Sequence, residues 1–234
     1  MPETSKEILR EAVEWDRKNW SKAFEFWERR LPEGRPLRCL EIGGRRGGPS
    51  LWLASKGHLV VCSDLENPEP IAKPLHEKYG VRGRVEYAAL DALSSPSDWM
   101  GTFDCVIFKS ILGGIARDGK DENRSRVIAN IHGLLKPGGL LLFAENLQGS
   151  RLHGLFRRRF VRWGASWNYL PFEHVGSLFA SFERLEWDTA GFLGAFGRKE
   201  WQRELFGRID RLILDGLVGS RNRYISFGAA WKSR

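Results

Sequence analysis

Short apolar runs alternate with amphipathic segments along most of this chain. The runs predict strands, because they are short and bounded by glycine, proline or charged residues. The first ends near residue 41, and the others are expected at 58–63, 84–90, 103–108, 139–145, 183–189 and 224–231. In the segments between the runs, apolar positions recur at helical spacing. This spacing predicts helices over 5–31, 50–56, 70–79, 122–135 and 199–217.

Strands that alternate with helices in this way predict an α/β fold. Each crossover helix connects two parallel strands, so we expect a doubly wound parallel sheet with helices on both faces. In such sheets a ligand binds at the carboxyl ends of the strands, where the strand order reverses. We therefore expect a binding site at the ends of the first and fourth strands.

Acidic residues and glycines gather at that edge of the predicted sheet. Glu41 ends the first strand, and glycines follow it within residues 43–48. Glycine lets a turn adopt positive φ and approach a ligand, and the next helix begins with free N–H groups. Asp64 follows the second strand, about 20 residues later, where an acid can hold ribose hydroxyls. Asp91 follows the third strand, and Lys109 ends the fourth.

The series of strand ends, and above all the Leu-Lys-Pro-Gly-Gly passage at 135–139, resembles the class I S-adenosylmethionine-dependent methyltransferases. The resemblance extends over roughly residues 35–150. It implies S-adenosylmethionine as cofactor and S-adenosylhomocysteine as product. In that family, groups at the first three strand ends hold the methionine, ribose and adenine parts in turn. Here these roles fall, in that order, on Glu41 with Gly43, Gly44 and Gly47, on Asp64 with Leu65, and on Asp91 with Ala92.

The same resemblance implies a particular architecture. It is a Rossmann-like, seven-stranded, mostly parallel sheet in which the last two strands form an antiparallel edge. We expect a single methyltransferase domain over 1–234, with a helical cap at 1–34, a cofactor-binding core at 35–150 and an acceptor side at 151–234. In the amphipathic helix at 199–217, we expect five apolar residues to face inward: Trp201, Leu205, Ile209, Leu212 and Ile213.

The glycine turn departs from the family pattern at one position. The family alternates three glycines, whereas the middle position here is Arg45. A side chain at this point either swings outward or narrows the cofactor pocket. We expect it to point outward, either as an exposed turn residue or toward the cofactor carboxylate or the acceptor.

Candidate catalytic groups lie in the loops after the fourth and fifth strands. His153 is our first candidate for a general base, since it follows the fifth strand where the acceptor should bind; packing within a helix is the alternative. Glu145 with Asn146 is the next candidate, and a strand-end acid of this kind can instead contact the backbone. Lys109 and Ser110 begin the fourth-strand loop, close to the transferred methyl group, or they simply shape that loop.

A formal net charge of +8 favours an anionic partner: nucleic acid, a membrane surface or an acidic small substrate. The position after the fourth strand reads Phe-Lys-Ser-Ile at 108–111, without the Asn/Asp-Pro-Pro-aromatic motif typical of amine-directed nucleobase methyltransferases. Nucleic acid is therefore the less favoured acceptor. At 151–163, arginines largely occupy one helical face and apolar residues the other. This pattern fits a helix at an anionic membrane or a mobile lid, and it equally fits an ordinary surface helix with a solvated arginine face.

Other features of the sequence bear on the location of the protein, the role of its cysteines and the presence of a metal. No run approaches the roughly 18 apolar residues that span a bilayer, and the first residues do not resemble a signal peptide, so we expect a cytoplasmic protein. The three cysteines fall within predicted strands and should pack in the core. The five histidines lack metal-ligand spacing, so we expect no metal.

The function that these features favour is O-methylation of a small-molecule or glycan acceptor. A nucleic-acid or protein methyltransferase is the alternative among enzymes of this family. From other classes, an NAD-dependent oxidoreductase and a catalytically silent cofactor-binding module remain open. The acid after the third strand argues against the oxidoreductase, and Arg45 is the reason to consider the silent module.

Overall fold

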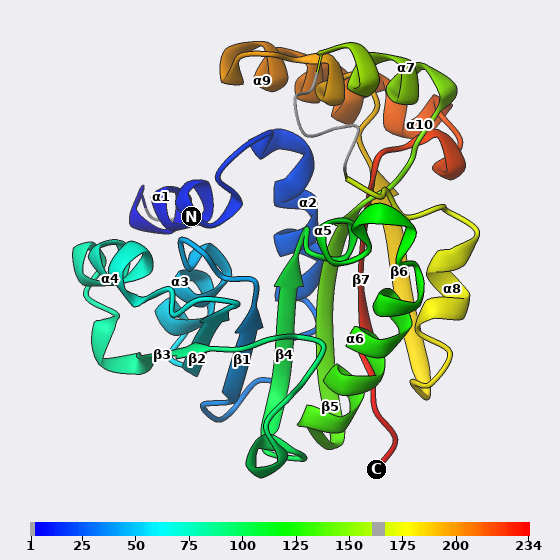
Figure 1. Cartoon of the computed structure of the whole chain (residues 1–234). Helices are drawn as coiled ribbons and strands as arrows, with labels where there is room; N and C mark the ends of the chain where they lie inside the picture. The colour runs from blue at the N-terminus through cyan, green and yellow to red at the C-terminus, as the bar shows by residue number, and fades with distance from the viewer. Residues whose placement is uncertain (1–2, 161–166) are drawn as a thin grey trace.

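A single twisted sheet forms the centre of the molecule (Figure 1). The computed structural model describes residues 3–160 and 167–234. Seven strands make up the sheet, in the order β3-β2-β1-β4-β5-β7-β6. Their bounds are β1 Arg38–Ile42, β2 Leu59–Asp64, β3 Val85–Ala89, β4 Phe103–Lys109, β5 Leu135–Asn146, β6 Arg184–Ala190 and β7 Ile225–Trp231.

Five of the strands run parallel, and the last two form the antiparallel edge. β1 pairs with β2 and β4, β2 with β3, and β4 with β5, all in parallel. β7 pairs antiparallel with both β5 and β6. This arrangement confirms the expected Rossmann-like fold class. The strand order reverses between β1 and β4, which places the switch point beside the glycine turn.

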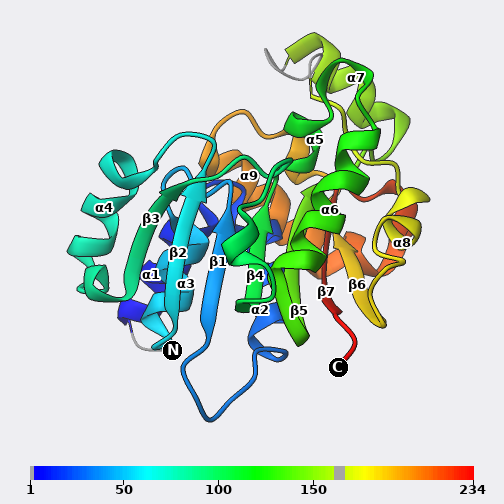
Figure 2. The same cartoon turned by 60° about the horizontal axis from the view of Figure 1, so that its bottom comes forward.

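Helices cover both faces of the sheet (Figure 2). α2 and α3 pack on one face through Trp20, Phe24 and Leu51, and α6 and α8 pack on the other through Ile131 and Val175. The helices are α1 Glu3–Val13, α2 Arg17–Glu28, α3 Gly48–Ser55, α4 Glu69–Lys78, α5 Leu112–Ile115, α6 Glu122–Leu134, α7 Arg151–Phe160, α8 His174–Leu178, α9 Glu200–Ile209 and α10 Asp215–Leu217.

The three cysteines are free and buried in the strands, where they pack as small apolar residues. Cys39, Cys62 and Cys105 all belong to the core beneath α2 and α3. Each large apolar side chain buried on this face contributes about 1.5–3 kcal/mol to stability. Successive residues of a strand alternate between this core and the core on the other face of the sheet. This alternation fixes the register in which the strands pair.

The N-terminal cap is two helices, not the single helix expected over 5–31. α1 ends at Val13, and α2 begins at Arg17. Glu14 and Asp16 adopt φ of 69° and 46°, in the left-handed region that ends a helix. The apolar positions on either side keep helical spacing, so the sequence pattern did not reveal this break.

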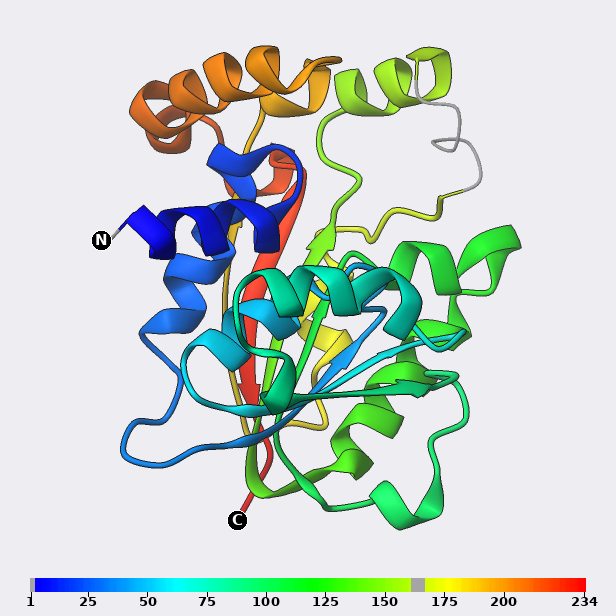
Figure 3. The ribbon, with the colours of Figure 1, turned by 90° about the vertical axis from the view of Figure 1, so that its left-hand side faces the viewer.

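α7, α9 and α10 form a layer beyond the carboxyl ends of the parallel strands (Figures 1 and 3). The prediction that five apolar residues of 199–217 face inward is wrong for four of them, and the fifth, Ile209, is half-buried. Trp201, Leu205, Leu212 and Ile213 are exposed, whereas Gly207 and Asp210 are buried. Within the described residues, every helix is too short or too polar to span a bilayer.

Candidate functional site

The glycine turn after β1 has a backbone shape and close contacts that require glycine at several positions. Gly43 and Gly47 have φ of 74° and 71°, where a side chain would be strained. A Cβ on Gly44 would lie only 2.8 Å from Cys62 Sγ, so β2 approaches the turn too closely for any larger residue. Arg45 also adopts positive φ, 36°, and it is exposed. Its side chain therefore points outward, as expected, and does not fill the turn.

Glu41 supports this turn from behind. Its carboxylate is buried and accepts hydrogen bonds from the Ser50 backbone N–H, at 2.9 Å, and from the Ser50 hydroxyl. Burial raises the pKa of Glu41 to about 7, against the hydrogen bonds from Ser50. The side chain thus ties the end of β1 to the first turn of α3. The family resemblance implied that Glu41 binds the cofactor, whereas in the structure its carboxylate bonds Ser50 within the protein.

Two further acids lie at the same edge of the sheet. Asp64 accepts hydrogen bonds from the backbone N–H groups of Arg45, at 2.9 Å, and Leu65, at 2.7 Å. The backbone N–H of Leu90 bonds the Asp64 carbonyl, which brings the segment after β3 alongside β2. Asp91 is exposed, and Asn130 donates to the carbonyl of Ala92. The structure therefore places the three predicted acidic positions at the carboxyl ends of the adjacent strands β1, β2 and β3.

Lys109 and Ser110 connect β4 to neighbouring parts of the fold. The Lys109 ammonium donates to the Val13 carbonyl at 2.8 Å and lies near the rings of Trp15 and Trp20. Burial lowers its pKa. Ser110 has φ of 59°, and its hydroxyl accepts a hydrogen bond from the Asn146 amide. Through its hydrogen bond to Val13, Lys109 holds the end of α1, in the N-terminal cap, against the end of β4.

Glu145 points back into the protein. It is fully buried at the end of β5, and it accepts hydrogen bonds from the backbone N–H groups of Leu112, at 2.6 Å, and Asn146, at 2.8 Å. Burial raises its pKa to about 7. The carboxylate thus caps the first turn of α5. Of the alternatives left open by the sequence, the backbone contact is the one observed.

His153 is also fully buried, within α7. Nε2 lies 2.8 Å from the Phe192 carbonyl, to which it donates, and Nδ1 accepts from the Ser150 backbone N–H at 3.0 Å. Its ring stacks on Phe196. Burial lowers the pKa of His153 to about 4, so the ring is neutral. Both nitrogens are engaged within the protein, and neither is directed into a cavity.

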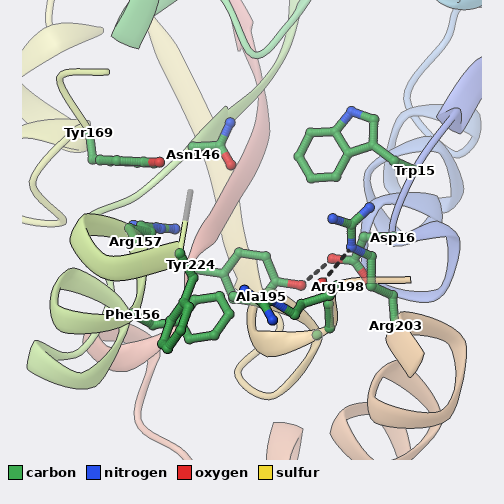
Figure 4. Close-up of a pocket in the computed structure, with 13 residues that line it drawn as sticks. Trp15, Asp16, Asn146, Phe156, Arg157, Tyr169, Ala195, Arg198, Arg203 and Tyr224 are labelled. Atoms are coloured by element: carbon green, nitrogen blue, oxygen red, sulfur yellow. Dashed lines mark hydrogen bonds between the residues drawn. The ribbon is translucent and has the colours of Figure 1, made fainter. Parts of the chain in front are cut away.

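A cavity of about 500 Å³ opens between the cap, the end of β5 and the outer helices (Figure 4). Asn146, which bonds Ser110 at the end of β4, connects the cavity to the cofactor edge. The lining is aromatic and basic, and its residues are Trp15, Asp16, Asn146, Phe156, Arg157, Phe160, Tyr169, Gly194, Ala195, Gly197, Arg198, Arg203 and Tyr224.

Asp16 and Tyr224 form a buried polar group at the wall of this cavity. The Tyr224 hydroxyl donates to Asp16, and the Asn19 amide donates to both Asp16, at 3.2 Å, and Tyr224, at 3.0 Å. Burial raises the pKa of Asp16 to about 7, against the hydrogen bonds from Tyr224 and Asn19. Sequence reasoning missed both residues, because the helix break and a contact across 208 residues leave no local pattern.

Within the described residues, no cluster of histidine, cysteine, aspartate and glutamate has the arrangement to hold a metal ion.

Residues 40–143 match a family model described as "Methyltransferase domain". A curated relative, the tRNA 5-carboxymethoxyuridine methyltransferase of Escherichia coli strain K12, is 29% identical over 162 residues. That match covers 67% of this chain and 56% of the relative, so the chain spans little more than half the length of the relative.

Solved structures share the fold at low sequence identity. The phosphoethanolamine N-methyltransferase 2 of Haemonchus contortus, solved with S-adenosylhomocysteine, superposes with a TM-score of 0.63 at 20% identity, covering 92% of this chain and 53% of that one. A S-adenosylmethionine-dependent methyltransferase of Methanosarcina mazei gives 0.61 at 20%, covering 88% and 96%. The [4+2]-cyclase SpnF gives 0.64 at 22%, covering 91% and 80%, so the fold alone does not fix the reaction.

Proposed function

The chain belongs to the class I S-adenosylmethionine-dependent methyltransferases, and from this premise we propose that it methylates an oxygen atom of a small-molecule or glycan acceptor. The cavity beside Asn146 carries this proposal. It adjoins the β4 edge through Ser110, and its volume of about 500 Å³ suits a compact acceptor.

The residues that would hold the cofactor fit it in this structure. The turn at 43–47 has the backbone shape and the close approach of β2 that exclude side chains from its inner side. The Asp64 carboxylate keeps lone pairs for ribose hydroxyls beyond its two backbone hydrogen bonds, with Leu65 beside it. We assign the adenine to Asp91 and Ala92, after β3. When bound, S-adenosylmethionine supplies an electrophilic methyl group.

The chain itself positions the acceptor and removes a proton. Trp15 and Tyr169 line the cavity, and flat apolar walls orient an acceptor and exclude water. We assign the proton to Asp16. Each of its carboxylate oxygens has a second lone pair besides the bond to Tyr224 or Asn19. A pKa near 7 for Asp16 suits a general base at neutral pH.

The three catalytic candidates from the sequence have contacts that favour positioning roles. Lys109 fastens the cap, Glu145 caps α5, and His153 joins α7 to the loop before α9. Replacing His153 by alanine separates the two roles. If His153 were the general base, the alanine variant would lose turnover and keep its melting temperature. We expect the melting temperature to fall and cofactor affinity to persist.

The acceptor class is tested by transfer of labelled methyl from S-adenosylmethionine to hydroxylated small molecules, glycans and bulk tRNA. We expect label in one of the first two classes. Treatment of the product with base identifies the atom, since a methyl ester is hydrolysed and a methyl ether is stable. Label in tRNA alone, or in an amine, would contradict the proposal.

A nucleic-acid acceptor is the second candidate, and two observations favour it. The curated relative is named for tRNA, and this chain has a net charge of +8. Binding to RNA should then weaken steeply with salt, because each phosphate contact releases counterions. Tight binding of tRNA that competes with transfer to small acceptors would support this candidate.

We also propose, from the arginine-rich pattern of 151–163, that α7 contacts an anionic membrane. Arg151, Arg158 and Arg159 are exposed on α7, and Leu152 and Leu155 are exposed beside them. Residues 161–163 lie outside the described residues. Amphipathic helices of this composition lie in the headgroup region of a bilayer.

A further inference from the structure

α7 turns its polar side toward the protein. Its buried residues are His153 and Arg157, and the Arg157 guanidinium donates to the carbonyls of Leu147, at 2.8 Å, and Gln148, at 2.9 Å. Leu152 and Leu155 are each 58% exposed. An ordinary surface helix places its apolar side on the core, so α7 has the reverse orientation.

α9 and the segment after it show the same reversal. Asp210 is buried and accepts hydrogen bonds from the backbone N–H groups of Leu193 and Gly194. Gly207 lies against Lys18 of α2, where a Cβ would meet the Lys18 Cβ at 2.5 Å. Trp201 and Leu212, in contrast, are 62% and 82% exposed. The polar and small residues make the contacts that position the helix, and Trp201 and Leu212 remain exposed.

Together these helices carry a set of exposed apolar residues, which we call the outer face. α7, α9 and α10 lie in the same layer in two perpendicular views (Figures 1 and 3). The exposed apolar residues of the outer face are Leu152, Leu155, Phe160, Trp201, Leu205, Leu212, Ile213 and Leu217. A concentration of large apolar side chains on one side of a protein marks an interaction surface.

The outer face is also strongly basic. Residues 151–160 and 198–222 contain ten arginines and lysines and four acids. Three of these acids form ion pairs, and the fourth, Asp210, is buried. Across the described parts of the chain, Arg151, Arg158, Arg159 and Arg198 are exposed and form no ion pair. Positive charge is therefore free at the same surface as the apolar residues.

We propose that the outer face docks on an anionic lipid bilayer, and that the acceptor is an amphiphile with an anionic head group that enters the cavity from that surface. The second half of this inference rests on the proposed function, since it places the acceptor in the cavity. Leucine and tryptophan enter the apolar edge of a bilayer while arginines contact lipid head groups. A second copy of the chain would bring like charges together, which opposes self-association through this face.

The cavity and the outer face share residues. Phe160 and Arg198 line the cavity and are also exposed on the outer face, and the Arg198 guanidinium lies 4.9 Å from the Phe160 ring. Arg203 lines the cavity from α9. An anionic head group entering here would meet these guanidinium groups, which bind carboxylate and phosphate well. The lipid tail would stay outside, in the bilayer.

Sedimentation with vesicles tests the docking. We expect the protein to pellet with phosphatidylcholine vesicles that contain phosphatidylglycerol, weakly with phosphatidylcholine alone, and less at high salt. The double variant Trp201→Ser/Leu212→Ser should bind at least about tenfold more weakly, since it loses two large apolar side chains. Ile71→Ser is the matched control, because Ile71 is 57% exposed on α4, away from the outer face. It should bind as the original chain does.

Two further measurements make the outcome decisive. Calorimetry with S-adenosylhomocysteine, together with thermal melting, checks that the double variant is folded. Light scattering reports whether the chain is a dimer that the double variant disrupts. Absence of binding to anionic vesicles, equal binding by the double variant, or such a dimer overturns the docking. Vesicle binding needs no methyl transfer, so a failure of docking and a failure of the proposed function appear in separate assays.

Discussion

Asp16 occupies a strained point of the backbone at the wall of the cavity. Its φ of 46° is unusual for a residue with a side chain, and such strain concentrates at functional sites. The carboxylate faces Tyr224, Asn19 and Asp210, and Arg203 lies nearby. Burial dominates these influences and raises the pKa of Asp16 to about 7. A carboxylate with this pKa exchanges protons readily at neutral pH.

Asp16→Asn keeps the shape of the side chain and removes the base. We expect kcat to fall by about 10²-fold or more, with the affinity for S-adenosylhomocysteine unchanged. In the original chain, kcat should rise as pH increases through about 7, because the ionised carboxylate is the active form. The variant should lose this dependence. Asp98→Asn, at an exposed position, is the control. A variant with full activity would exclude Asp16 as the base.

The sequence allowed prediction of which residues lie at the carboxyl ends of the parallel strands, but not of the contacts that each residue makes there. Strand ends and glycines are local features, so Glu41, Asp64 and Asp91 could be placed together in advance. The contacts of each carboxylate depend on how deeply the folded chain buries it, which the sequence does not show. Glu41 and Glu145 both lie near the ends of buried strands, and each accepts a hydrogen bond from a backbone N–H in the first turn of a helix: Glu41 from α3, which follows its own strand, and Glu145 from α5, which follows β4. Asp16 could not be found, because its function depends on a partner near the other end of the chain.

At the scale of elements, periodicity predicted helices more reliably than their orientation. The apolar positions of α9 repeat at helical spacing, which establishes the helix and its two faces. The spacing does not say which face has a partner. Asp210, Gly207 and Arg203 made the closer contacts with α2 and the loop before α9, so the apolar side remained outside.

Asp210 is the residue that holds α9 in this orientation. Asp210→Ala leaves the backbone N–H groups of Leu193 and Gly194 without acceptors, at a buried position. We expect the free energy of unfolding to fall by about 3 kcal/mol, measured by urea denaturation. Asp215→Ala, in the neighbouring partly exposed ion pair with Lys22, should cost about 1 kcal/mol or less. Equal losses in the two variants would contradict this account of the helix orientation.

At the scale of the molecule, the sheet order explains why distant segments form one site. Parallel strands bring the segments after β1, β2, β3 and β4 to one edge, and the antiparallel β7 brings Tyr224 to the cap. The alternation of strands and helices predicted the parallel part of the sheet from the residues themselves. The antiparallel edge was expected from the family resemblance. The cavity could not be predicted, since it lies between elements that touch only in the folded chain.

The same packing makes stability depend on pH. Asp16, Glu41 and Glu145 have pKa values of about 7 in the folded chain, raised by burial from ordinary values near 4. The folded state therefore binds more protons than the unfolded state, and stability decreases as pH rises through 7. From pH 6.5 to 8 we expect the free energy of unfolding to fall by roughly 2 kcal/mol.

Urea denaturation at the two pH values measures this change. The double variant Glu41→Gln/Glu145→Gln should show a smaller difference, because two of the three groups no longer titrate. His153 has its pKa lowered to about 4 by burial, so its effect on stability appears only below about pH 6.5. If the free energy of unfolding were greater at pH 8 than at pH 6.5, burial would not raise the pKa values of these carboxyl groups in the folded chain, and the account would be wrong.

The central claim, an adenosyl cofactor held at the ends of β1, β2 and β3, is tested most directly by calorimetry. S-adenosylmethionine, S-adenosylhomocysteine and NADH are titrated separately into the full chain and into Asp64→Ala. We predict dissociation constants of about micromolar for the two adenosyl ligands, none for NADH, and binding at least about tenfold weaker in the variant. Binding of NADH without either adenosyl ligand, or no binding of any of the three, would contradict the account.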